Sequence, residues 1–232
     1  MKNVYLQQYQ DILEAYQTKL KALNRQIEEN NRNFSAEYAE QQNKEIRAEK
    51  EKTYEEAKDL IRKNYEETKL LLSTASFIDV EDMTADRLIF ESGFQLTKQD
   101  IRAYLERYKD NFTMKRLICD WVKKQPKPEQ YGDIVFATPE EQLEVYKRFG
   151  EKAMYVANGI YGERKEHFIP LEIESFQDET MCARELAVIG DGKALEQYRS
   201  KSKRMPETQL HIFDGVQMDE YKGQGNENSY MH

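Results

Sequence analysis

A chain of 232 residues that is 39% hydrophobic and 34% charged is lean for one large globular core, so its composition favours an elongated protein. Its 15 Tyr and 10 Phe argue against a wholly disordered chain. The formal net charge of −8 at pH 7 disfavours non-specific binding to nucleic acid, which needs clustered Lys and Arg.

Membrane insertion and secretion find no support in the sequence. No apolar run reaches the ~18 to 20 residues that cross a bilayer, and the start of the chain lacks the basic-then-apolar layout of a signal peptide. Cys119 and Cys182 stand far apart, without the spacing of a disulfide or zinc framework. We therefore expect a cytoplasmic protein with buried free thiols and no membrane contact.

Residues 1–73 organise the chain, because they contain no Gly, Pro or Cys and their apolar side chains recur every three or four positions. The pattern predicts either one long coiled-coil helix or a helical hairpin. A polar Asn30 within the seam favours pairing with Asn30 of a second copy, and so a parallel dimer. The predicted oligomerisation positions are Tyr9, Leu13, Tyr16, Leu20, Leu23, Ile27, Asn30, Phe34, Ile61, Tyr65 and Leu72.

The hairpin alternative depends on the middle of this stretch. Asn is a weak helix former, and three of the four residues 30–33 are Asn. Ser35 follows as a good N-cap residue, with Glu37 in the first turn. No Gly or Pro forces a reversal here, so the pattern leaves both a continuous helix and a hairpin open.

The pattern over residues 74–125 predicts a small helical unit, whose first part, residues 74–82, is a linker. Thr84 is the expected cap of a short helix that stops at Gly93, and Thr97 with Asp100 indicates a capping arrangement for the next. Thr113 is the expected cap of a third helix, which ends before Pro126. Two helices around a tight turn also fit a DNA-reading helix-turn-helix over residues 97–124. Its contact residues would be Lys115, Arg116, Lys123 and Lys124.

Residues 126–205 predict a second helical unit with loops. A brief strand is expected at 134–136, and residues 138–141 hold the elements of a capping box, so a helix should begin at Pro139 and end at Asn158 and Gly159. A loop is expected over 160–175, in which the alternation of Leu171 and Ile173 favours one strand, and a helix is expected over 176–189. A second basic cluster suits a nucleic acid or an acidic protein face. It consists of Arg199, Lys201, Lys203 and Arg204.

The last stretch, residues 206–232, predicts a minor β-hairpin around Asp214 and Gly215, followed by a flexible tail. The same stretch also suits a short docking peptide. The fold class expected overall is mainly α: a long N-terminal helix or hairpin, a small bundle of shorter helices, and this one hairpin.

The sequence contains no recognisable motif for catalysis, metal binding or phosphate binding. His167, His211 and His232 lack metal-binding spacing, and no nucleophile motif occurs. Residues 190–193, Gly-Asp-Gly-Lys, lack the length and the Ser/Thr of a phosphate-binding loop and are better interpreted as a turn between helices. We predict no enzyme activity, no catalytic residues, no cofactor and no metal.

A resemblance to a known class is carried by residues 88–124, behind the charged coil. Its features are Gly93, the helix start at Leu96 and Thr97, the turn at Asp110 and Asn111, and the continuation through residues 113–117. In order and character these resemble small proteins of tailed bacteriophages that are encoded beside the major capsid protein. Phage scaffolds commonly carry a basic C-terminal helix, whereas here the basic cluster at 199–204 is followed by an acidic-to-neutral stretch.

The resemblance implies a scaffold-like or head-accessory protein in the bacterial cytoplasm or associated with the virion. Its coil would form a homo-oligomer, a dimer being favoured, and another region would dock on capsid protein. Two alternatives stay open. One is a nucleic-acid-binding regulator that uses residues 97–124, and the other is a phage protein that binds and blocks a host factor.

Overall fold

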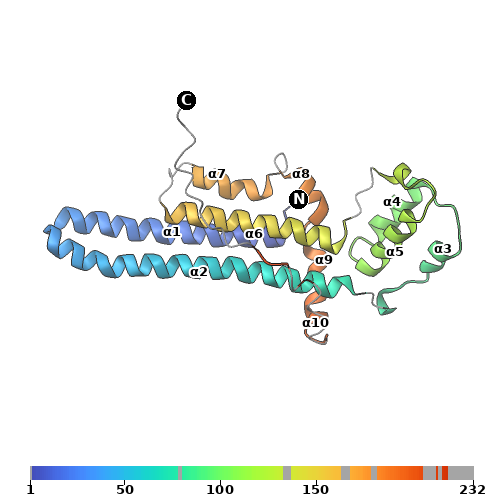
Figure 1. The fold of residues 1–232 in the computed structure, drawn as a ribbon, viewed down its shortest axis with the longest axis horizontal. Coiled ribbons are helices and arrows are strands. Elements are labelled where there is room, and N and C mark those ends of the chain that lie inside the picture. The colour runs from blue at the N-terminus through green and yellow to red at the C-terminus, as the bar shows by residue number, and fades with distance from the viewer. Residues whose placement is uncertain are drawn as a thin grey trace, which may run out of the picture.

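The computed structural model describes residues 2–77, 80–132, 137–162, 168–178, 182–205, 213 and 216–218. Two long helices, α1 (Val4–Asn33) and α2 (Ala36–Ser76), run antiparallel as a hairpin (Figure 1). Phe34 and Ser35 join them in extended conformations, and the Phe34 N–H bonds to the carbonyl of Asn30 and closes α1. The hairpin alternative is thus confirmed, and a single continuous rod is wrong.

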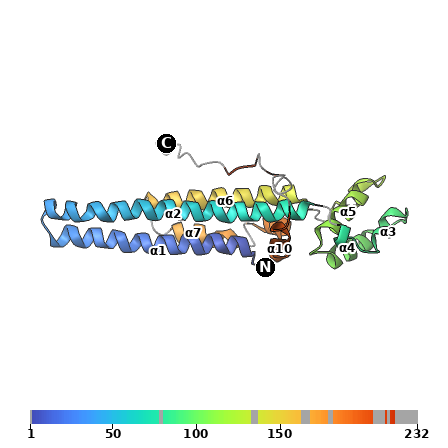
Figure 2. The same cartoon turned by 90° about the horizontal axis from the view of Figure 1, so that it is seen from below.

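A third helix, α6 (Pro139–Tyr161), packs along the hairpin to make a three-helix bundle (Figures 1 and 2). It begins as predicted, because the Thr138 side chain accepts from the Glu141 N–H and the Glu141 side chain accepts from the Thr138 N–H. The expected stop at Asn158 and Gly159 is wrong, since the helix continues to its cap at Gly162. The apolar face of α6 is buried against α1 and α2 along this whole length, which outweighs one weak helix former at Gly159.

Short helices cover the bundle and share its core. They are α7 (Phe168–Glu174), the 3₁₀ turn η3 (Ser175–Gln177), α8 (Ala183–Ile189), α9 (Lys193–Glu196) and α10 (Tyr198–Ser202). Ile173 and Phe176 are fully buried in the same cluster as the hairpin, so the described residues from Pro139 to Met205 share the core of the hairpin. The expected loop at 160–175 holds α7 instead. The helix expected to begin at Phe176 is wrong at its start, where η3 ends and Asp178 is extended, and a helix is described over Ala183–Ile189.

A small unit, which we call the head, lies beyond the far end of α2 and has its own core (Figure 1). It consists of η1 (Val80–Asp82), α3 (Arg87–Glu91), α4 (Lys98–Arg107), α5 (Phe112–Lys123) and η2 (Pro128–Tyr131). The Thr97 capping box is confirmed. The predicted cap Thr113 is wrong, because the cap lies two residues earlier, at Asn111, whose side chain accepts from the Met114 N–H, and α5 begins at Phe112.

The head core is largely aromatic. Trp121 lies between Phe90 and Tyr131, at ring-centroid distances of 6.2 and 6.1 Å, both edge-on. Such pairs add to the hydrophobic gain of burial, which suits a unit too small for a large aliphatic core.

The mainly α class is confirmed for the part of the chain that the structure describes, where every regular element is a helix. The strand expected at 134–136 lies outside the described residues. Of the expected C-terminal hairpin, only Phe213 and residues 216–218 are described; they form no strand, although the Val216 N–H bonds to the Phe213 carbonyl at 2.8 Å. Among the described helices, none combines the length and the apolar content needed to cross a membrane.

Candidate docking surfaces

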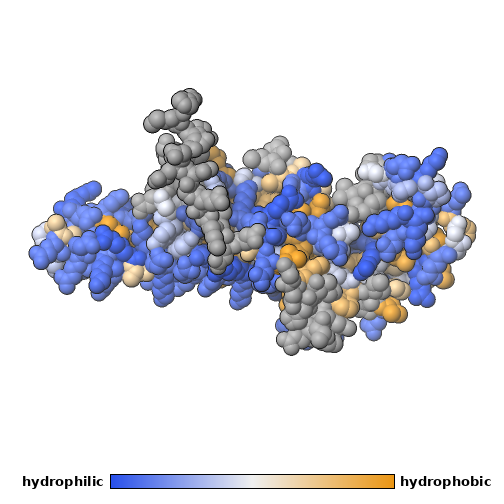
Figure 3. All heavy atoms as spheres, viewed as in Figure 1, coloured by the Kyte–Doolittle hydropathy of each residue, from blue (hydrophilic) through white to orange (hydrophobic). Residues whose placement is uncertain are grey.

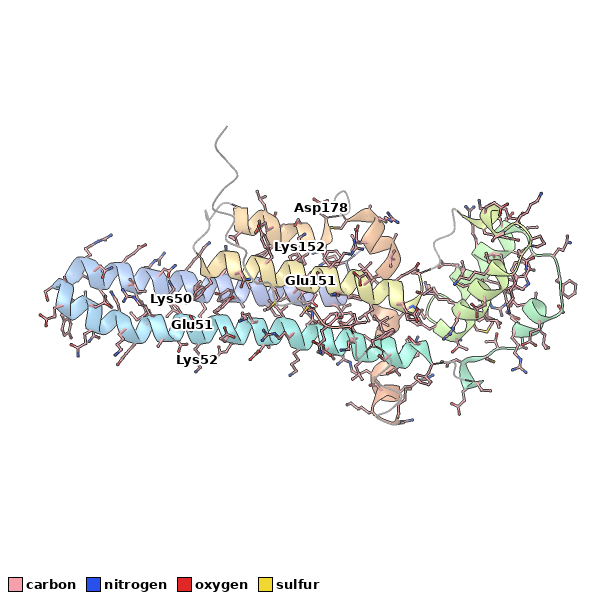
Figure 4. The ribbon with its side chains drawn as sticks, in the orientation of Figure 1. Lys50, Glu51, Lys52, Glu151, Lys152 and Asp178 are labelled. Carbon is pink, nitrogen blue, oxygen red and sulfur yellow. The ribbon has the colours of Figure 1, made fainter. Side chains whose placement is uncertain are left out.

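The outer half of the hairpin, residues 20–50, projects past the end of α6, and we call it the arm. At its base Tyr161 of α6 stacks on Tyr54 of α2, with ring centroids 4.5 Å apart, and its hydroxyl bonds to Glu51. Tyr16 of α1 also packs against Tyr54, with ring centroids 6.3 Å apart. In Figure 4, Lys50, Glu51 and Lys52 lie at this level, and only α1 and α2 continue beyond it.

The arm has a thin interior. Leu20, Leu23 and Ala39 are buried between the two helices, and most other arm residues are exposed. On the face visible in Figure 3, the arm is mostly hydrophilic. A two-helix arm with so little apolar area is held together less firmly than the bundle at its base.

Close to its end, the arm is held by a polar network around Asn43, which is fully buried. Asn30 Nδ2 donates to Asn43 Oδ1 at 2.9 Å, and Asn43 Nδ2 donates to Asn31 Oδ1 at 2.8 Å. The expected pairing of Asn30 with Asn30 of a second copy is therefore replaced by pairing within one chain. The reason is the reversal at Ser35, which brings Asn43 opposite the run of asparagines.

The tip of the arm carries an exposed aromatic pair. Phe34 and Tyr38 are 47% and 48% exposed, and their rings meet edge-on at 5.0 Å. One side chain ends α1 and the other lies in the first turn of α2, so the reversal itself brings them together. The spacing along the chain predicts Phe34 in a buried seam and assigns Tyr38 no role, although the Ser35 N-cap signal between them marks both as tip residues.

Most of the predicted oligomerisation residues are buried within the single chain. Ile27 and Asn30 are half-buried and Phe34 is half-exposed. The others are 9% exposed or less: Tyr9, Leu13, Tyr16, Leu20, Leu23, Ile61, Tyr65 and Leu72. The apolar seam is filled by α2 and α6, which leaves the tip as the part of the predicted set that faces solvent.

The first predicted basic group consists of Lys115, Arg116, Lys123 and Lys124 on α5. Two of these side chains make contacts within the protein, and the other two are exposed. Arg116 donates to the Ser76 carbonyl at 3.0 Å, which ties the head to the end of α2. Lys115 lies 4.7 Å from the centre of the Phe112 ring, and burial lowers the pKa of its amine. Lys123 and Lys124 are exposed at the end of the helix. Lys115, Arg116 and Lys123 line one cleft between α5 and the start of α6, which Asp120 and Glu140 also line, so carboxylates offset part of their charge there.

The second basic group is similarly divided. Arg199 bonds to Glu67 of α2 and to Glu196, and these carboxylates raise the pKa of its guanidinium. Lys201 pairs with Asp82 of the head at 2.8 Å. These contacts fasten α10 to both parts of the molecule. Lys203 and Arg204 are exposed.

A cleft of about 830 Å³ separates the head from the turn at residues 190–193. Gly190 and Gly192 have φ of +60° and +75°, as expected for a tight turn between helices. The cleft contains basic and acidic side chains in mixture: Lys193 is 3.9 Å from Asp191, and Lys115 donates to the Lys109 carbonyl. This mixture does not resemble a phosphate site.

The closest approach to a catalytic pair is Lys152 of α6 with Ser175 of η3, where Nζ donates to Oγ at 2.8 Å. Burial lowers the pKa of Lys152, which is labelled on α6 in Figure 4. Its amine lies 4.7 Å from the centre of the Phe176 ring. Ser175, however, donates its own proton to the Glu172 carbonyl at 2.7 Å. The hydroxyl is thus held as a link between α6 and η3, and it is not directed at a substrate space.

The part of the chain that the structure describes holds no evident site for thiol or metal chemistry either. Cys119 is buried, and burial raises the pKa of its thiol to about 11; Cys182 lies against the Ser175 carbonyl at 3.4 Å. Among the described residues, no group of three or more His, Cys, Asp and Glu side chains is placed to hold a metal ion. His167, His211 and His232 lie outside them.

The fold and its surfaces define an elongated, helical protein made of a three-helix bundle, a projecting two-helix arm and a small head. Comparison with known proteins adds no relative: no protein-family profile, no curated protein and no solved structure matches the chain.

Proposed function

We propose that this chain is a non-enzymatic assembly or accessory protein of the scaffold-like kind, which works by self-association and by docking on another protein. The observation that carries the proposal is the arm: a two-helix projection whose end presents Phe34 and Tyr38 half-exposed to solvent. Aromatic side chains are the commonest anchors of protein interfaces, and a projecting arm makes them accessible to a partner.

The partner that we propose is capsid protein of a tailed phage, with a second copy of the chain as the self-association partner. The choice of a phage capsid as the partner rests on the resemblance of residues 88–124 to phage proteins encoded beside the capsid protein. The arm supports this choice because it holds a contact point away from the bundle. The coil partner first expected for α1 is supplied by the chain itself, so the proposed self-association uses the tip.

A nucleic-acid role receives less support. Arg116, Arg199 and Lys201 are engaged by a carbonyl and by carboxylates of the same chain. Engaged cations release fewer counterions from a phosphate backbone than free ones would, so they contribute little to such binding.

Sedimentation velocity over a range of concentrations tests the self-association. We expect the wild-type chain to associate, and the double variant F34S/Y38S to associate at least tenfold more weakly, which corresponds to about 1.4 kcal/mol. Leu60→Ser is the matched control, because Leu60 is 50% exposed on α2 away from the tip and its loss should change nothing.

Co-expression with the major capsid protein of the same genome tests the docking. The wild-type chain should co-sediment with capsid shells, and F34S/Y38S should not. A chain that stays monomeric and never co-sediments would overturn the proposal. A salt-sensitive mobility shift of DNA that is lost in the variant K123Q/K124Q would indicate that the chain acts by binding nucleic acid.

A further inference from the structure

Lys115 of α5 is a half-buried lysine that makes no ion pair with the described residues. Its amine donates to the Lys109 carbonyl at 3.3 Å and lies 4.7 Å from the centre of the Phe112 ring. An ammonium group has three N–H donors, and this long bond uses only one of them. Burial lowers the pKa of the amine, and the charge of Asp110, which acts from further away, offsets this only in part. A ligand that supplies a negative charge would therefore stabilise the charged amine.

The amine lies at the cleft of about 830 Å³ between the head and the turn at residues 190–193, which we call the head cleft. Its acceptor Lys109 lines the head cleft and not the smaller cleft between α5 and α6. In Figure 1 the head lies beyond the end of the bundle that carries α8 and α9. Leu105 and Phe112 line the head cleft from the head, and Val188 lines it from α8. Its volume falls within the range of about 300–1,000 Å³ that is usual for small-molecule sites.

The charged side chains of the head cleft leave a small positive surplus. Besides Lys115, they are Arg102, Glu106, Lys109, Asp110, Asp191 and Lys193. Lys109 Nζ lies 3.5 Å from Glu106, and Lys193 Nζ lies 3.9 Å from Asp191, so these cations are partly neutralised. Four cations against three carboxylates leave one unit of positive charge. One negative charge matches this surplus, whereas a doubly charged phosphate would be repelled by the three carboxylates.

We propose that the head cleft binds a small organic monocarboxylate, whose carboxylate group bonds to the Lys115 amine and whose apolar body lies against Leu105 and Val188. Hydrogen bonds between an ammonium and a carboxylate are roughly twice as strong as neutral ones, so this contact anchors the ligand. Leu105 and Val188 are half-buried, and a ligand that covers their remaining apolar surface gains affinity from it.

The ligand would touch α5 of the head and α8 of the bundle at once, so its binding holds the two parts together. A ligand that binds only this arrangement stabilises it by mass action. Amide hydrogen exchange in α4 and α5 should therefore slow when the ligand is added. The head cleft lies at the opposite end of the molecule from the arm (Figure 1), so the proposal does not depend on the self-association proposed for the tip.

Titration of the full chain with hexanoate, followed by backbone amide resonances, tests the site. We expect saturable shifts for the residues that line the head cleft, and an affinity for hexanoate about tenfold above that for hexanamide, because the amide lacks the charge. Inorganic phosphate should not displace hexanoate. Equal affinities for hexanoate and hexanamide, no saturable shift with either, or displacement by phosphate would each overturn the proposal.

Lys115→Gln separates the anchor from the apolar walls. It should lower the affinity for hexanoate about tenfold and leave the affinity for hexanamide unchanged. Lys124→Gln is the matched control, because Lys124 is exposed at the end of the same helix and does not line the head cleft. An equal loss of hexanoate affinity in both variants would refute Lys115 as the anchor.

Lys193→Glu provides a second measurement if Lys115→Gln loses helix content in circular dichroism. Lys193 is exposed at the head cleft, so the substitution should leave the fold intact while it replaces a cation by a carboxylate. Hexanoate should bind this variant several-fold more weakly. Lys203→Glu, an exposed position outside the head cleft, should bind hexanoate as the wild type does. An unchanged affinity in Lys193→Glu contradicts the proposal as well.

Discussion

The polar network at Asn43 makes a prediction about how the arm is held. Asn43→Ala removes two side-chain hydrogen bonds, one with Asn30 and one with Asn31, at 2.9 and 2.8 Å. Each contributes about 1 kcal/mol net, and alanine returns about 0.6 kcal/mol through its better helix propensity. The arm should therefore lose about 1.5 kcal/mol of local stability.

Hydrogen exchange followed by mass spectrometry is the suitable assay, because the arm can open while the bundle stays folded. A loss of about 1.5 kcal/mol raises exchange rates roughly tenfold. The increase should be confined to peptides within residues 20–50, and peptides from α6 should exchange as in the wild type.

Gln42→Ala is the matched control, since Gln42 precedes Asn43 on the same helix and is exposed. It should leave the exchange of the arm unchanged or slightly slower. Equal acceleration in both variants, or none in Asn43→Ala, would refute the reasoning that a buried amide network holds the arm. Acceleration that depends on protein concentration would instead indicate that Asn30 pairs between copies.

Three further outcomes are expected. Thr138→Ala removes the N-cap of α6 and should cost about 1 kcal/mol, seen as a fall of about 2–4 °C in Tm; an unchanged Tm would mean that the cap is not needed. Arg199→Gln frees α10 from Glu67 and should lower Tm by a similar amount, whereas Lys203→Gln, an exposed neighbour, should not. Cys119, with a thiol pKa of about 11, should react with iodoacetamide at pH 8 about 100-fold more slowly in the native than in the denatured chain, and equal rates by mass spectrometry would contradict its burial.

Local signals in the sequence located two helix starts and missed two others, because α3 begins after Asp86 and not after the expected cap Thr84. Thr97 and Thr138 each stand three residues before an acidic side chain, and both form complete capping boxes. Such motifs depend only on neighbours along the chain, so tertiary packing rarely overrides them. The prediction of Thr113 as the cap of α5 is wrong because Asn111, two residues earlier in the same loop, is the better N-cap residue.

The partner of an apolar stripe is not encoded locally. The seam that contains Leu13 and Leu20 suits a second copy or a returning helix equally well, and only the reversal at Ser35 decides between them. Gly150 and Gly159 weaken α6 by propensity, yet the helix continues because its buried face is fixed by α1 and α2. The reason for Gly150 lies in Met218, 68 positions away, which no local pattern reveals.

The candidate surfaces were partly visible in the sequence. Phe34 was singled out as an apolar residue, but its exposure follows from the turn and not from its spacing. The basic residues were correctly seen as clusters along the chain. Their partners Glu67 and Asp82 come from distant helices, so the engagement of Arg199 and Lys201 emerged only in three dimensions.

The geometry of the arm also fixes a length scale for any assembly in which the tips meet. From Leu20 to Asn33 the helix rises by about 20 Å, at 1.5 Å per residue. Two molecules in contact at Phe34 and Tyr38 would hold their bundles about 40 Å apart, twice that rise. The arm would then act as a ruler, and lengthening both of its helices by whole turns should widen the spacing in steps without altering the contact itself.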